Sequence, residues 1–89
     1  MPLDKISDGT DLLTLRKALG FNQAEMAKRM GLGARAYFTL EQEPASVNIR
    51  HVKLAEYVAL SEAVARGDRD LAPRSVAKLA DAFAKLRAK

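Results

Sequence analysis

In the stretch NQAEMAKRMGLGARAYFTLE, residues 22–41, apolar side chains recur at the three- and four-residue spacing of a helix, first over 22–30 and again over about 34–42. Gly31 follows the first run, at a position where a helix commonly ends in a left-handed turn. The stretch therefore predicts two short helices joined by a tight turn, which is the layout of a helix-turn-helix.

Local chemistry supports these two helices. Asn22 can accept the backbone N–H of Glu25, and the Glu25 carboxylate can reach back to the N–H of Asn22. The residues expected to face inward are Met26, Ala27, Met30, Tyr37 and Leu40. The pattern thus indicates one buried and one exposed face on each helix.

The rest of the chain is also predicted to be helical, since no run alternates apolar and polar residues as a half-buried strand would. A helix over about 9–19 is expected to be capped by Ser7 or Asp8 and ended by Gly20. Its expected inner residues are Leu12, Leu15 and Leu19.

After Pro44, which ends the helix-turn-helix unit, two more helices are predicted. One runs over about 49–66 and ends at Gly67, and the other has Pro73 in its first turn. The apolar residues expected to be buried in the first of these are Ile49, Val52, Leu54, Ala55, Val58 and Leu60.

Composition and charge narrow the class of protein. The 89 residues suit one small domain and include no cysteine, which excludes disulfides and thiolate metal sites. No apolar run approaches the roughly 20 residues of a membrane span, and the start lacks the order of a signal peptide, so we expect a cytoplasmic protein and no membrane partner. The net charge is +4, and five Lys and Arg stand against one acidic residue between positions 14 and 35. This balance suits a polyanionic partner.

Catalysis, a metal site and a cofactor are not expected. His51 is the only histidine, and the chain has neither a phosphate-binding glycine loop nor paired carboxylates on a common face. We expect His51 to be a surface or helix-capping residue.

Residues 12–60 resemble the DNA-binding domain of phage Cro and repressor proteins, the XRE-like helix-turn-helix family. The matching residues are Leu15, Arg16, Gln23, Met26, Ala27, Gly31, Leu32, Tyr37, Leu40 and Glu41. The resemblance implies an all-α, five-helix lambda-repressor-like domain with the helix-turn-helix at its second and third helices, and an ion pair between Arg16 and Glu41. We assign residues 1–67 to this domain and 68–89 to an additional C-terminal amphipathic helix of the same domain.

The resemblance also implies where double-stranded DNA would bind. Base contacts fall on Ala34, Arg35 and Thr39, with the outward-facing Phe38 beside them, and phosphate contacts fall on Gln23, Ser46, Asn48 and Arg50. Arg35 is the principal candidate, because a guanidinium can bond both major-groove acceptors of guanine.

Three residues depart from the family pattern. Gly33 replaces the Ser or Thr that usually caps the third helix, Glu43 replaces a frequent glycine, and Phe38 replaces a polar residue. Few direct hydrogen bonds to bases are therefore expected, and DNA shape would contribute to recognition.

The last helix carries an apolar stripe of Val76, Leu79, Phe83 and Leu86. This stripe would be buried either on the preceding helix or against a second copy, and we favour the second copy because these side chains are large for a peripheral helix. The resemblance then implies a homodimeric transcriptional regulator, a repressor of the kind common on phages and mobile elements, bound to an inverted-repeat operator. The alternative is a protein-binding helix-turn-helix module, antitoxin-like or an anti-activator, that uses the Phe38 face.

Overall fold

The computed structural model describes residues 3–86, which form helices and no strand. The α-helices are α1 (Gly9–Leu19), α2 (Gln23–Met30), α3 (Ala34–Gln42), α4 (Ile49–Arg66) and α5 (Arg74–Ala84), with short 3-10 turns at Pro44–Ser46 and Arg69–Leu71. The prediction of an all-α chain is confirmed for this part, although the C-terminal helix is the fifth helix rather than an addition to five. Between residues 3 and 86, no helix has both the length and the apolar character needed to cross a membrane.

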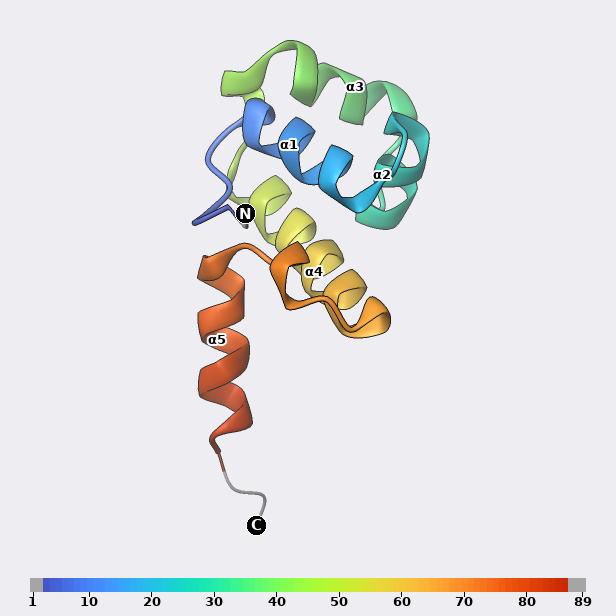
Figure 1. Ribbon diagram of the computed structural model, residues 1–89. Helices are drawn as coiled ribbons and strands as arrows, with labels where there is room; N and C mark the ends of the chain where they lie inside the picture. The colour runs from blue at the N-terminus through green and yellow to red at the C-terminus, as the bar shows by residue number, and fades with distance from the viewer. Residues whose placement is uncertain (1–2, 87–89) are drawn as a thin grey trace.

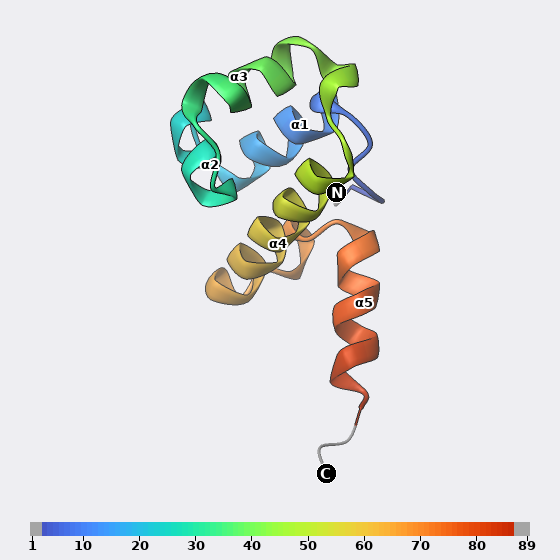
Figure 2. The same cartoon turned by 180° about the vertical axis from the view of Figure 1, so that it is seen from behind.

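The helices form a compact body from which one helix projects. Helices α1, α2 and α3 pack together above α4, and α5 extends away from the end of the molecule opposite α3 (Figures 1 and 2). The exposed side of α3 and the projecting α5 are therefore far apart, and neither covers the other.

The helix ends lie where capping chemistry predicts them. Asp8, rather than Ser7, caps α1 by accepting the backbone N–H of Asp11 at 3.1 Å. Asn22 and Glu25 form the expected reciprocal capping box of α2. Gly31, with a φ of 76°, ends α2 in the left-handed conformation that favours glycine.

The core lies between the first four helices. The predicted inward residues of α1, α2 and α3 are all buried, namely Leu12, Leu15, Leu19, Met26, Ala27, Met30, Tyr37 and Leu40. Ile6 and Phe21 complete it from the connecting segments. Burial of these side chains supplies the main driving force for folding.

The prediction that Ile49 and Leu54 are buried is wrong, because both side chains are exposed. Helix α4 meets the core mainly through small side chains, which allow its backbone to approach closely. Its buried residues are Ala55, Val58, Ala59 and Ala63. Ile49 is the first residue of the helix, and Leu54 lies to the side of this alanine-rich face.

The start of α5 is attached to the body by hydrogen bonds. The backbone N–H of Arg74 donates to the carbonyl of Leu3 at 2.8 Å, and the hydroxyl of Ser75 donates to the Glu56 carboxylate at 2.6 Å. Pro73 is buried and is the N-cap of α5, one residue before its predicted place in the first turn. These contacts fix the direction of α5, while the rest of the helix projects.

Candidate nucleic-acid interface

Helices α2 and α3 are joined by residues 31–33 and pack closely against each other. The backbone N–H of Leu32 donates to the carbonyl of Ala27 at 2.8 Å, which closes the turn. Ala27 is buried, and the Leu32 side chain packs against the core. The turn therefore fixes how α3 is placed relative to α2.

The inner side of α3 is held by the carboxylate of Glu41. Arg16 donates to it through Nε at 2.7 Å and through Nη2 at 3.1 Å. Gln23 Nε2 donates to it at 2.9 Å, and the Tyr37 hydroxyl also donates to it. The ion pair expected between Arg16 and Glu41 is thus present, with side chains that are only 14% and 5% exposed. It connects α1, α2 and α3 at one point.

The pKa values in this cluster reflect competition between burial and hydrogen bonding. Burial alone would raise the pKa of Glu41, but hydrogen bonds from Arg16, Tyr37 and Gln23 outweigh it, so the pKa is lowered. Burial, together with the hydrogen bond to Glu41, raises the pKa of Tyr37. Glu41 is therefore ionised and Tyr37 protonated near neutral pH.

The outer side of α3 is open. Ala34 and Arg35 are exposed, and no ion pair within residues 3–86 involves Arg35. Thr39 is half-buried, and its hydroxyl donates to the carbonyl of Arg35 at 3.1 Å. The Phe38 side chain is 46% exposed, so it is not a core residue.

A surface hollow of about 400 Å³ lies between the start of α2 and the outer side of α3. Gln23 and Ala24 line it from α2, and Ala34, Arg35 and Phe38 line it from α3. It therefore gathers three of the four predicted base-contact residues. The N-terminus of α3 has no side-chain cap, since Gly33 occupies the capping position.

The residues predicted to contact phosphates differ in whether their side chains already form hydrogen bonds or ion pairs within the protein. Gln23 uses its amide nitrogen to bond Glu41. The Ser46 hydroxyl donates to the carbonyl of Glu43 at 2.6 Å. Arg50 is exposed at the start of α4 and has no ion pair within the described residues. Of these three, Arg50 has the side chain most available to a phosphate.

Asn48 caps α4, accepting the backbone N–H groups of Arg50 and His51. His51 accepts the backbone N–H of Asn48 through Nδ1 at 3.1 Å, which confirms its predicted capping role. The Asn48 amide NH2 group remains the only part of that side chain able to donate to a phosphate.

One side-chain cluster, between the end of α2 and the end of α4, was not predicted. The guanidinium groups of Arg29 and Arg66 lie over the ring of Phe21, at 4.9 and 5.4 Å from its centroid. Both arginines also bond the carboxylate of Glu62, at 2.6 and 2.9 Å. This cluster connects the end of α2 to the end of α4. Only the spacing of Glu62 and Arg66, one helical turn apart, was visible in the sequence.

No family model, curated protein or solved structure matches this chain. The function must therefore be argued from the geometry of the site.

Proposed function

We propose that this protein is a sequence-specific DNA-binding regulator that places α3 in the major groove of double-stranded DNA. The observation that carries the proposal is the open outer side of α3, on a helix whose inner side is held by Glu41. Helix α3 has nine residues, and an α-helix with its side chains is about 10–12 Å in diameter. The major groove is about 12 Å wide and admits a helix of this kind.

In this proposal α3 supplies the base contacts. Arg35 donates to both acceptors of a guanine, a contact that discriminates by about 1–3 kcal/mol against other bases. Ala34 and Phe38 offer apolar surface to thymine methyl groups beside the hollow, and Thr39 adds a methyl or hydroxyl contact. Because only one long polar side chain is involved, sequence-dependent DNA shape contributes the rest of the specificity.

The starts of α2 and α4 supply the phosphate contacts. At the start of α2, the N–H groups that the capping box does not use and the helix dipole attract phosphate oxygens, whereas at the start of α4 Asn48 already accepts the N–H groups of Arg50 and His51. Arg50 adds a full charge at the start of α4 and does not need to leave an ion pair to bind. Gln23 and Asn48 contribute through amide hydrogens that their internal hydrogen bonds do not use, whereas the Ser46 hydroxyl must leave the Glu43 carbonyl to donate to a phosphate.

The regulator acts as a homodimer through the stripe Val76, Leu79, Phe83 and Leu86. Val76 is half-buried, whereas the other three side chains are exposed. For both copies of α3 to meet one duplex, the two-fold axis must run roughly along α5, because α3 and α5 lie at opposite ends of the molecule (Figure 1). The dimer then binds an inverted repeat and acts most simply as a repressor.

The direct test is selection of bound duplexes from a random pool. The expected result is an inverted repeat with half-site centres about 34 Å apart, or a multiple of one helical turn. If repeated rounds enrich no sequence, the proposed function is wrong. The selected sequence then serves as the operator in binding titrations of variant proteins.

Arg35→Ala is expected to abolish preference for one base of each half-site while the protein stays folded. Arg50→Ala is the matched control. It should weaken binding to all sequences alike and reduce the salt dependence, because a phosphate contact carries no base information. Binding titrations against operator and single-base variants at several salt concentrations separate the two effects. Unchanged base preference in Arg35→Ala would remove Arg35 from its proposed role.

The exposure of Phe38 favours one other function, a protein-binding module with the same helices. A partner would then cover Phe38 through apolar contact. Phe38→Ala would abolish capture of that partner, and the selection would enrich no DNA. Enrichment of an operator together with retained DNA binding in Phe38→Ala would exclude this alternative.

A further inference from the structure

Two apolar surfaces lie side by side on the projecting part of the molecule. The first is the stripe of large side chains on one side of α5, where Phe83 is 75% exposed and Leu79 and Leu86 are also exposed. Within residues 3–86, no other element covers these side chains. Three large apolar side chains in water on one short helix mark a surface that is normally buried.

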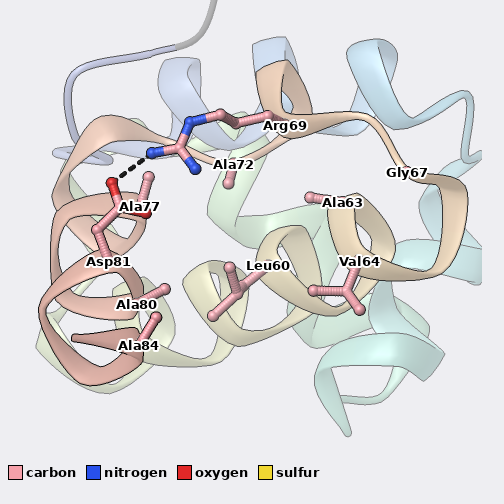
Figure 3. Close-up of a pocket in the computed structure, with 10 residues that line it drawn as sticks. All are labelled: Leu60, Ala63, Val64, Gly67, Arg69, Ala72, Ala77, Ala80, Asp81 and Ala84. Carbon is pink, nitrogen blue, oxygen red and sulfur yellow. Dashed lines mark hydrogen bonds and ion pairs between the residues drawn. The ribbon is translucent and has the colours of Figure 1, made fainter. Parts of the chain in front are cut away.

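The second surface is a groove of about 410 Å³ between α4 and α5. Leu60 and Val64 line it from α4, and Ala77, Ala80 and Ala84 line it from α5. In Figure 3, Ala80 and Ala84 point toward Leu60 across the gap, and the ion pair between Arg69 and Asp81 lies at its edge. Val64 is 75% exposed, so this α4–α5 groove is open to solvent.

The two surfaces complement each other in size. The groove wall on α5 consists of alanines, whereas the adjacent stripe consists of leucine and phenylalanine. At 100° per residue, the groove side of α5 (Ala77, Ala80, Ala84) and the stripe lie roughly a third of a turn apart on the same helix. Within one chain the stripe cannot enter the groove, because the two surfaces lie on different sides of the same helix, α5.

We propose that the α4–α5 groove of one copy receives the Leu79–Phe83–Leu86 stripe of a second copy, and that the exchange is reciprocal. With a two-fold axis running along α5, the two α5 helices lie in parallel and touch near Ala80. The stripe of each then faces α4 of the other copy. The interface therefore includes Leu60 and Val64 of α4 as well as α5.

The size and charge of the surfaces favour a second copy as the occupant. The exposed side chains of Val64, Leu79, Phe83 and Leu86 offer on the order of 500 Å² per copy, taking about 150 Å² for the aromatic. The groove walls Leu60, Ala77, Ala80 and Ala84 add to this area, which approaches the roughly 600 Å² per partner at the low end of stable interfaces. Arg74, Lys78 and Lys85 fall on the opposite side of α5 by helical spacing, so within residues 3–86 the paired α5 helices bring no like charges together.

The inference deepens the homodimer of the proposed function but is independent of DNA. Its test measures association of the protein alone, so it can fail while DNA binding holds. Conversely, DNA binding can fail while the interface holds.

The test uses Val64→Lys, which alters the groove, and Phe83→Asp, which alters the stripe. Both side chains are exposed in the single chain, so folding should persist, as circular dichroism can verify. Sedimentation should show that each variant alone dimerises at least about 100-fold more weakly than the wild type, because each change occurs twice in the interface. Mixed one to one, the two variants should form a heterodimer, since the unaltered stripe of one fits the unaltered groove of the other.

Three results would overturn the inference: a monomeric wild type at millimolar concentration, wild-type dimerisation of Val64→Lys, or failure of the mixture to associate. A second measurement leaves the charge of the interface unchanged and uses the same Phe83→Cys chain in both mixtures. The chain has no cysteine, so Val64→Cys mixed with Phe83→Cys should form a mixed disulfide faster than Thr10→Cys mixed with Phe83→Cys. Equal rates in the two mixtures would also overturn it.

Discussion

Replacing Glu41 with glutamine removes a charge from the point where α1, α2 and α3 meet and changes few atoms. The carboxylate accepts two hydrogen bonds from Arg16, one from Gln23 and one from Tyr37. A glutamine keeps one acceptor oxygen, and its NH2 group must face at least one of these donors. The largely buried guanidinium of Arg16 would then have no counter-charge.

The size of the loss follows from this geometry. Removing one partner of a buried ion pair costs about 3–5 kcal/mol, and the slight exposure of Arg16 places the expected value near the lower end, at about 3 kcal/mol. A domain of this size loses roughly 4–8 °C in Tm per kcal/mol. Thermal and urea unfolding should therefore show Glu41→Gln melting roughly 12–24 °C below the wild type.

Glu62→Gln is the matched control, because Glu62 also accepts hydrogen bonds from two arginines. Its partners Arg29 and Arg66 are 52% and 40% exposed, so water can solvate them when the charge is lost. Such exposed pairs contribute about 0–1 kcal/mol. If the free energies of unfolding of the two variants differ by less than about 1 kcal/mol, the burial of Arg16 does not set the cost of losing its counter-charge.

The same cluster predicts an acid dependence of stability. The pKa of Glu41 is lower in the folded chain than its ordinary value of 4.5. Its contribution is therefore fully present above pH 4.5 and is lost as pH falls through the lowered folded pKa. Urea unfolding between pH 7 and pH 3 should show a smaller loss for Glu41→Gln than for the wild type. Equal losses would contradict the lowered pKa.

Three further changes test other parts of the structure. Tyr37→Phe removes one hydrogen bond to the charged Glu41 carboxylate and should cost about 1.5–2 kcal/mol in urea unfolding, so a cost as large as that of Glu41→Gln would contradict the shared role. Gly9→Ala should cost about 1–3 kcal/mol, because its Cβ would lie 1.9 Å from the backbone oxygen of Leu40; Gly33→Ala, with nothing within 4 Å, is the control. Phe83→Asp should convert a sedimenting dimer to a monomer and roughly halve the slope of log affinity against log salt on DNA, and an unchanged slope would mean that a single copy makes all phosphate contacts.

The helix boundaries could be predicted because the chemistry that sets them is local. Asn22 and Glu25 cap α2 across three residues, and Asn48 and His51 do the same for α4. Gly31 ends α2 by its own backbone preference. The spacing of apolar residues also identified the buried sides of α1, α2 and α3, where one side of each helix is clearly more apolar.

The same spacing was only partly right for α4, where Ala55 and Val58 are buried as predicted, because this helix is apolar on more than one side. Ile49 and Leu54 are exposed, while the smaller Ala55 and Ala59 face the core. Apolar size alone does not tell which side of such a helix is covered, since that depends on how closely the neighbouring helices approach. The burial of Gly9 against α3 depends on the same close approach of helices, and no pattern in the sequence predicted it.

Some residues of the candidate site could be named from the sequence, and the surroundings of others needed the folded structure. The family resemblance named Arg35, Phe38 and the Arg16–Glu41 pair; local patterns alone could not have named this pair, whose members are 25 residues apart. The folded chain was needed to show that Phe38 lies outside the core and that α5 projects away from α3. It was also needed to bring Arg29 and Arg66 onto Phe21. Capping and periodicity act within one or two turns, whereas the packing of α4 and α5 joins residues that are distant in the chain.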